Sequence, residues 1–204
     1  MIKASFLARP ALGLALLVAT SACSSNQTAN EADAANAMAA NDMTMNNMAV
    51  NGMASMSKTA PLIDAKGATI GEATLTETAG GTMLAISGRG LPPGEHGFHV
   101  HMTGKCETPK FESAGGHWNP ASKKHGHENP QGAHAGDLPN LTVAANGTVK
   151  FETELAGMRL IGGEQPLFDN DGAAVVIHAD PDDEKTDPSG NSGARIACAA
   201  FPAS

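Results

Sequence analysis

The sequence has little basic charge and few long apolar runs. It holds 13 Lys and Arg against 21 Asp and Glu, a formal net charge of −8. Because neutralising phosphates requires clustered Lys and Arg, this balance argues against nucleic acid as a partner. Beyond the N-terminal segment, apolar runs at helical spacing are missing, and 23 Gly and 12 Pro break the chain into short segments. The 204 residues therefore favour one all-β domain with extensions.

The first segment, residues 1–23, is typical of a secretory signal peptide. Two basic residues precede an apolar run over 11–19, and small residues then lead to Cys23. The run is too short to span a bilayer as a stable helix, and the alternative is a buried core helix. The ending TSAC resembles a bacterial lipobox, although Thr20 stands where Leu is usual. Lipidation of Cys23 and plain cleavage after Ala22 both stay open, and a lipid there would be the chain's membrane anchor.

Aromatic residues are absent from residues 24–58, which are rich in Met, Asn and Ala. Such a segment cannot bury enough apolar surface to offset its ordering entropy, so we expect a disordered tether. Six of the ten methionines lie in it, and soft thioethers suit Cu(I). Copper collection by the tether and simple low-complexity drift are the two interpretations.

From residue 59 onward, short segments alternate with turn signals. Asn146-Gly147 is the strongest hairpin signal among them. The expected strands are 60–64, 69–77, 82–88, 94–102, 140–144, 148–154, 173–179 and 194–201. Strands at this spacing indicate a sandwich or barrel. Two long loops, 103–138 and 180–193, interrupt it, and loops of that length in a compact domain are usually functional.

Histidine is concentrated in one stretch, 96–137. It contains seven of the eight histidines of the chain: His96, His99, His101, His117, His125, His127 and His134. Residues two apart in a strand point to the same face, so His99 and His101 can reach one ion. The rest of the stretch is rich in Gly, Pro, Asn and Ser, and therefore can fold back over that pair as a loop. The pattern predicts a metal site.

Six motifs in order give this site a closer definition. They are GFHVH at 97–101, GGHWNP at 115–120, KKHG at 123–126, HAGDL at 134–138, VIH at 176–178 and GARIAC at 193–198. Together they resemble the copper-zinc superoxide dismutases, over about residues 59–201. The resemblance implies a domain over 59–204 with an eight-stranded Greek-key β-barrel. It also implies that the two long loops are a metal and disulfide loop and an electrostatic loop.

The resemblance also implies a pair of metal sites that share one ligand. The implied copper ligands are His99, His101, His117 and His178, and the implied zinc ligands are His117, His125, His134 and Asp137. The chemistry agrees with this division. Three imidazoles and one carboxylate suit a closed tetrahedral zinc, whereas imidazoles around a more open site suit redox-active copper.

Other residues match positions around the metals. Arg195 matches an active-site arginine, whose forked, permanently charged guanidinium suits docking of a small anion. Asp182 matches an aspartate that hydrogen-bonds one ligand of each metal, although the neighbouring Asp183 is an alternative. His96 matches a position where the ring packs between loop and strand. His127 has no counterpart among the ligands, and we expect it to face solvent.

The resemblance pairs Cys106 with Cys198 as an intrachain disulfide between the metal loop and the last strand. Such a bond persists in exported proteins, and with Cys23 lipidated the cysteine count comes out even. These features predict an exported, periplasmic protein that is tethered to a membrane as a lipoprotein.

The implied reaction is dismutation of superoxide to oxygen and hydrogen peroxide, with copper cycling between two oxidation states and zinc as a structural partner. In the family, His117 leaves copper in the reduced state and holds a proton, so it also acts as an acid. The alternative is a copper or zinc storage or delivery module on the same barrel, for which Arg195 would have no use. The resemblance implies either a monomer or a homodimer.

Overall fold

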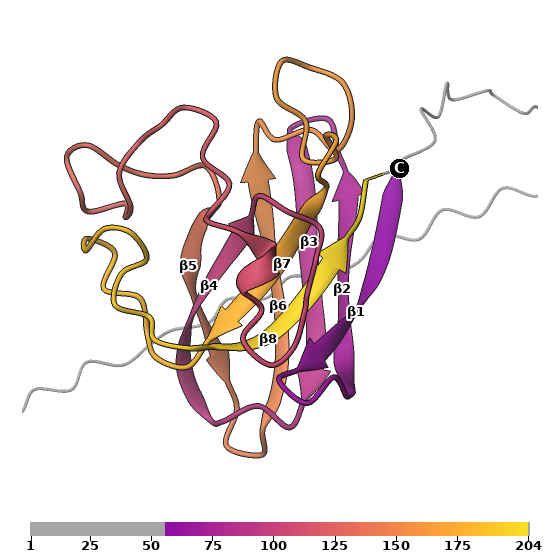
Figure 1. Ribbon diagram of the computed structural model, residues 1–204, viewed down its shortest axis with the longest axis vertical. Helices are drawn as coiled ribbons and strands as arrows, with labels where there is room; N and C mark the ends of the chain where they lie inside the picture. The colour runs from indigo at the N-terminus through magenta and orange to yellow at the C-terminus, as the bar shows by residue number, and fades with distance from the viewer. Residues whose placement is uncertain (1–55, 204) are drawn as a thin grey trace, which may run out of the picture. The chain divides into compact units, whose positions relative to one another are not determined.

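The computed structural model describes residues 56–203, so the expected signal peptide and nearly all of the expected tether lie outside it. The described chain is all-β (Figure 1), with one turn of 3-10 helix, η1, over Glu112–Ala114. The strands are β1 Ser57–Asp64, β2 Thr69–Glu77, β3 Gly81–Arg89, β4 Gly94–His101, β5 Asp137–Val143, β6 Thr148–Ala156, β7 Ala173–His178 and β8 Arg195–Phe201. The prediction of an eight-stranded all-β fold is confirmed.

All eight strands belong to one antiparallel sheet, in the order β5-β4-β7-β8-β1-β2-β3-β6. The sheet curls into a nearly closed barrel, with β5 and β6 as its two edges (Figure 1). These edges are joined by the tight turn at Asn146-Gly147, where Gly147 has a φ of 77° that glycine adopts without strain. The pairs β4–β7, β1–β8 and β3–β6 join strands that are not consecutive along the chain, which is consistent with a Greek key.

Two strands begin three residues before the expected start, and the other strand boundaries agree with the expected ones to within two residues. β1 begins at Ser57, so residues 57 and 58 belong to the sheet, where Ser57 Oγ lies 2.9 Å from Thr76 Oγ1 of β2. β5 begins at Asp137, three residues before the expected start. The added residues include Pro139, which is tolerated because β5 is an edge strand and a proline there need not donate to the ladder.

The barrel is filled by the inward-facing residues of its strands. Leu62, Leu75 and Leu84 are fully buried there, and Phe98 meets Phe151 edge to face with ring centroids 5.5 Å apart. Such close packing holds the strands in one register and gives β4 a rigid base.

β7 is buried on both faces, which explains its continuous apolar sequence. Val175 and Ile177 belong to the barrel core. On the opposite face, Ala174 and Val176 pack with Phe111 of the long loop after β4. This second cluster holds the loop against the outside of the barrel.

The two long loops, now bounded as residues 102–136 and 179–194, lie on the same side of the barrel (Figure 1). The predicted disulfide is present: Cys106 of the first loop is bonded to Cys198 of β8, with a Cα–Cα distance of 5.8 Å. Within residues 56–203, no helix has the length and apolarity needed to cross a bilayer.

Candidate metal centre

β4 presents two histidines to the outside of the barrel. His99 and His101 are fully buried, since the loops cover this face, and they pair in register with Val176 and Ala174 of β7. The period of two along a strand gives their rings a common direction, as expected from the sequence. His178, the last residue of β7, brings a third ring to the same place, with its ring centroid 4.9 Å from that of His99.

Four histidines, including His117 from the loop, each have one buried ring nitrogen without a hydrogen-bond partner. These nitrogens are His99 Nδ1, His101 Nε2, His117 Nε2 and His178 Nε2. A buried polar atom without a partner is costly, and one such atom in a domain already calls for a reason. Here all four residues offer ligand atoms within 4.8 Å of one another. A set of converging imidazole lone pairs fits a copper ion.

The opposite nitrogen of three of these rings is held by the protein. His99 Nε2 donates to Asp182 Oδ2 at 2.6 Å, and His101 Nδ1 donates to the carbonyl oxygen of Gly115 at 3.0 Å. His178 Nδ1 donates to the carbonyl oxygen of Gly193 at 3.2 Å. Each outer hydrogen bond fixes a tautomer that leaves the inner nitrogen free to bind a metal.

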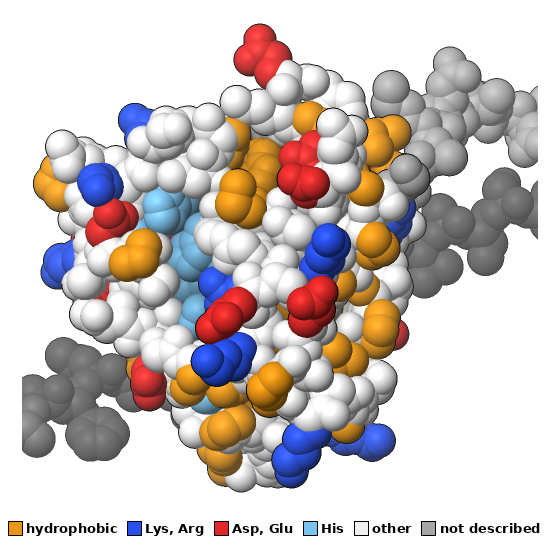
Figure 2. Space-filling model, viewed as in Figure 1, with side chains coloured by type: hydrophobic (Ala, Val, Ile, Leu, Met, Phe, Trp, Pro, Cys, Tyr) orange, Lys and Arg blue, Asp and Glu red, His pale blue; other side chains and the backbone are white. Residues whose placement is uncertain are grey.

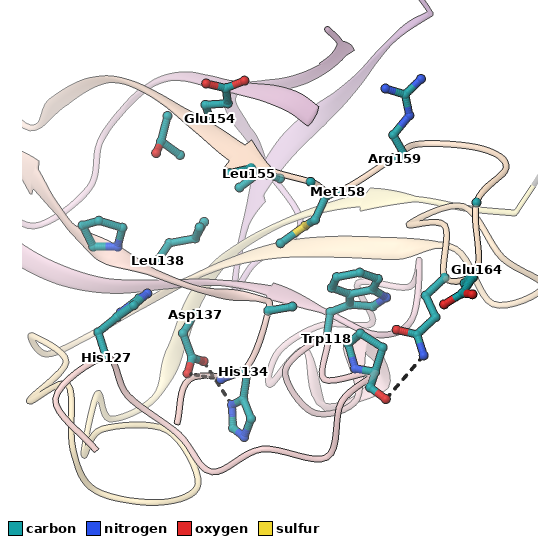
Figure 3. Close-up of a pocket in the computed structure, with 18 of the residues that line it drawn as sticks. Trp118, His127, His134, Asp137, Leu138, Glu154, Leu155, Met158, Arg159 and Glu164 are labelled. Carbon is teal, nitrogen blue, oxygen red and sulfur yellow. Dashed lines mark hydrogen bonds and ion pairs between the residues drawn. The ribbon is translucent and has the colours of Figure 1, made fainter. Parts of the chain in front are cut away.

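A second cluster gathers around one carboxylate oxygen. Asp137 Oδ1 lies 2.8 Å from His117 Nδ1, 3.0 Å from His125 Nδ1 and 3.0 Å from His134 Nδ1. His134 Nδ1 and His117 Nδ1 are 3.3 Å apart. Ligand atoms at zinc-bonding distance on the corners of a tetrahedron are about 3.3 Å apart, so this set fits zinc. Figure 3 shows His134 and Asp137 together on the wall of a hollow that is also lined by Trp118 and Met158.

The backbone prepares Asp137 for this role. The amide groups of Gly126 and His134 both donate to Asp137 Oδ2 at 2.9 Å, which leaves Oδ1 turned toward the three imidazoles. These bonds and the histidines hold the pKa of Asp137 well below its usual range, although burial alone would raise it. The oxygen is therefore an anion at neutral pH. His117 belongs to both clusters, with Nε2 in the first and Nδ1 in the second.

The two clusters differ in their affinity for protons. Burial lowers the pKa of His117 to about 4 and that of His178 to about 3, and it lowers the pKa of His101 well below the ordinary value. Burial also opposes protonation of His125, but hydrogen bonds with Asp137 and Asp182 outweigh it and raise its pKa to about 10. The first cluster is thus neutral at pH 7, while a proton occupies His125 when no cation does.

Asp182 connects the clusters. Besides accepting from His99 at Oδ2, its carboxylate faces His125 Nε2, which lies 3.0 Å from Oδ1 and 2.9 Å from Oδ2. Asn140 of β5 holds the backbone of Asp182 from both sides: Asn140 Nδ2 donates to its carbonyl oxygen at 2.9 Å, and its amide donates to Asn140 Oδ1 at 2.8 Å. The sequence analysis did not identify Asn140; the only signal for it was a polar residue within an expected strand. The neighbouring Asp183 is exposed and bonds within its own loop, to Thr186 and Asn191.

Arg195, the first residue of β8, reaches across to the metal loop. Its Nη1 donates to the carbonyl oxygen of Phe111 and its Nη2 to that of Gly115, both at 2.7 Å. Burial lowers the pKa of the guanidinium, which nevertheless stays charged at neutral pH. Arg195, His117 and His178 line a hollow of about 360 Å³. On the surface, histidine side chains are visible in a depression between the two loops (Figure 2).

The loops are also joined directly to each other. Lys124 Nζ lies 2.8 Å from Asp187 Oδ2, and His127 Nδ1 lies 2.8 Å from Glu184 Oε2. His127 is half exposed, in the solvent-facing place expected for it, and belongs to neither cluster. His96 is buried between loop and strand, with Nδ1 2.8 Å from the carbonyl oxygen of His178 and Nε2 2.8 Å from that of Pro92.

Comparison with known proteins agrees with this geometry. Residues 69–201 match the family described as copper/zinc superoxide dismutase (SODC). A Superoxide dismutase [Cu-Zn] 2 of Aquifex aeolicus is 48% identical over 141 residues, which are 68% of this chain and 82% of that protein. A Superoxide dismutase [Cu-Zn] of Caulobacter vibrioides is 43% identical over 145 residues, 70% of this chain and 83% of that protein.

Solved structures show the same likeness. In the crystal structure of a SOD-like protein from Bacillus subtilis, the chain is 44% identical in sequence to this one. The TM-score is 0.67, and the match covers 70% of this chain and 96% of that one. The Cu/Zn superoxide dismutase from Brucella abortus is 28% identical, with a TM-score of 0.56 over 71% of this chain and 99% of that one.

Proposed function

The chain belongs to the copper/zinc superoxide dismutase family, and from that premise we propose which residues carry its dismutation of superoxide to oxygen and hydrogen peroxide. Copper is held by the first cluster, His99, His101, His117 and His178, and zinc by the second, His117, His125, His134 and Asp137. The observation that carries this assignment is the convergence of four buried ring nitrogens that have no partner in the protein. Copper, when bound, supplies alternating one-electron reduction and oxidation, while zinc has no redox chemistry.

His117 is the proton-handling residue in this proposal. Its Nδ1 is held beside Asp137, so Nε2 is the atom at which a proton is taken up and given away. Dismutation consumes two protons for each pair of superoxide anions. Because burial depresses the pKa of His117 to about 4, a proton on Nε2 is readily released to a peroxide anion.

Arg195 docks the anion. Two of its donors are used on the carbonyl oxygens of Phe111 and Gly115, which leaves the other donors of the fork for superoxide. Its position in the wall of the 360 Å³ hollow, beside His117 and His178, places a permanent positive charge at the approach to the copper ligands. A storage module gains nothing from such a charge, and this favours turnover over storage.

The test combines metal analysis with an activity assay on the full chain. We expect one copper and one zinc per chain, fast superoxide consumption, and loss of both copper and activity in His178→Ala. Full loading with both metals and no activity in the unmutated chain would favour the storage alternative instead.

The location of the protein is a separate proposal. A disulfide is typical of exported proteins, and residues 1–23 read as a signal peptide, which supports a periplasmic lipoprotein anchored through Cys23. Mass spectrometry of the mature N-terminus distinguishes lipidation from cleavage after Ala22. We also propose that the expected tether, without the residues that belong to β1, collects copper; deleting residues 24–55 should slow copper loading when copper is scarce.

Two statements about partners complete the proposal. A homodimer is the assembly we propose, and light scattering at micromolar concentration would reveal a monomer if it is wrong. Nucleic acid is not expected to bind, because the net charge is −8; retention of the protein by immobilised DNA at physiological salt would contradict this.

A further inference from the structure

Met102 has an unusual setting for a thioether. It directly follows His101 at the end of β4, and its amide donates to the carbonyl oxygen of Gly116 at 3.0 Å. Its side chain is 50% exposed, whereas Met158 is 6% exposed and Met83, on β3, is intermediate. Among residues 56–203, Met102 and Ile161 are the large hydrophobic residues that stand exposed to this degree.

The sulfur of Met102 lies at the edge of the copper ligand set. A hollow of about 310 Å³ is lined by both Met102 and His117, and the neighbouring hollow that holds Arg195 is lined by His117 as well. The thioether rests on the glycines before His117: a Cβ built on Gly115 would be 2.9 Å from Met102 Cγ and 3.4 Å from its Sδ. Because His117 lines both hollows, a small molecule that moves from the Arg195 hollow past His117 into the second hollow comes within reach of the sulfur.

We propose that Met102 is a modification site, oxidised to methionine sulfoxide by the hydrogen peroxide that the centre itself releases. The inference rests on the proposed function, because dismutation is the source of the oxidant. The sulfur attacks one peroxide oxygen and the O–O bond breaks. That oxygen stays on the sulfur, the other leaves as water with both protons, the sulfur is oxidised by two electrons and the peroxide is reduced by two.

The surroundings of Met102 accept the product. Sulfoxide formation disrupts cores because it makes an apolar side chain polar, but at 50% exposure the new oxygen can be hydrated. Met102 therefore takes up oxidant at the edge of the site at little cost to the fold, and methionine sulfoxide is a form that reductases can restore.

The experiment follows each methionine of the copper- and zinc-loaded full chain by peptide mass spectrometry during turnover of added potassium superoxide. One arm contains catalase, which removes peroxide from the bulk solution but is too large to enter the hollow. We expect Met102 sulfoxide to form at least about tenfold faster than Met158 sulfoxide, and to persist in the catalase arm while Met83 is protected. Equal protection of Met102 and Met83 by catalase would overturn the proposal.

Two controls separate this proposal from the proposed function. Superoxide consumption is measured in the same samples, so a chain that fails to dismutate is recognised independently of its oxidation pattern. Reagent peroxide added to metal-free protein should oxidise Met102 and Met83 in proportion to their exposure alone, which gives the baseline. Met102→Leu should keep its dismutation rate, and the peptide that contains residue 102 should no longer gain the mass of one oxygen. If that peptide gains an oxygen to the same extent in the variant, another residue in it is the one oxidised.

Discussion

Asp182→Asn tests the link between the two clusters. The carboxylate of Asp182 accepts hydrogen bonds from His99 Nε2 at 2.6 Å and from His125 Nε2 at 2.9 Å. An amide of the same shape replaces one of the two oxygens by an NH₂ group, so one of the two imidazole N–H groups then faces a donor and loses its acceptor. Asn140 holds the backbone of Asp182 in the variant as well, and the Glu184 amide, which donates to Asp182 Oδ1 at 2.7 Å, keeps an acceptor when the amide oxygen takes that position.

The size of the effect follows from the group left without a partner. A buried donor that loses its acceptor costs about 1–3 kcal/mol. At about 1.4 kcal/mol for each factor of ten, this corresponds to metal binding weakened about 10- to 100-fold, the usual range for residues that orient metal ligands. The loss should fall mainly on zinc if the amide oxygen turns to His99, and on copper if it turns to His125.

Competition titrations with chelators of known affinity measure both metals, and Asp183→Asn is the matched control. Asp183 lies in the same loop, and its substitution removes the same charge, but its carboxylate bonds to Thr186 and Asn191 at the surface. We expect near-normal affinities for both metals in the control. Equal losses of metal affinity in the two variants would refute the reasoning and point to a general effect of charge. Unchanged metal affinity in Asp182→Asn would refute it as well.

Three further outcomes are expected. Arg195→Ala should lower kcat/KM about tenfold or more and weaken its salt dependence, and Arg195→Lys should recover only part, because one ammonium cannot hold two carbonyls and an anion together. Replacing Cys106 and Cys198 by Ser removes a link across 92 residues and should lower the free energy of unfolding by about 4–5 kcal/mol, measured in urea; an unchanged midpoint would contradict this. The raised pKa of His125 means that a proton competes with zinc for this side chain at every pH below about 10. The proposed copper ligands His117 and His178, by contrast, stay unprotonated down to about pH 4 and about pH 3. Dialysis at pH 5 should therefore remove zinc before copper, as metal analysis would show.

Turn signals and motifs in the sequence predicted most of the barrel. Asn146-Gly147 marks the β5–β6 turn, and the apolar run over 173–179 becomes a strand buried on both faces. The start of β5 was placed three residues late, and the residues left out include Pro139, which fits a strand only at the edge of a sheet. Edge position is a property of the whole sheet, and a local reading of the sequence does not contain it.

The proposed metal ligands were named from the sequence because six motifs resemble one family and histidine is concentrated in 96–137. The groups that orient them were harder to foresee. Gly115 and Gly193 act through carbonyl oxygens, which every residue has, and Asn140 acts through an amide that could equally face water. Such roles depend on how the chain folds back on itself, and side-chain identity alone does not reveal them.

The two halves of the centre are built on supports of different stiffness. Three proposed ligands of the first half, His99, His101 and His178, belong to paired strands, while the proposed ligands His125 and His134 of the second half belong to a loop with little regular structure. Copper should thus meet a preformed set of ligands, whereas zinc must order part of its own site and bind with a larger entropic cost. Zinc would act in that case as a second cross-link beside the disulfide. Zinc supply would then control the freedom of the loop that carries His117, and leave the barrel beneath it unchanged.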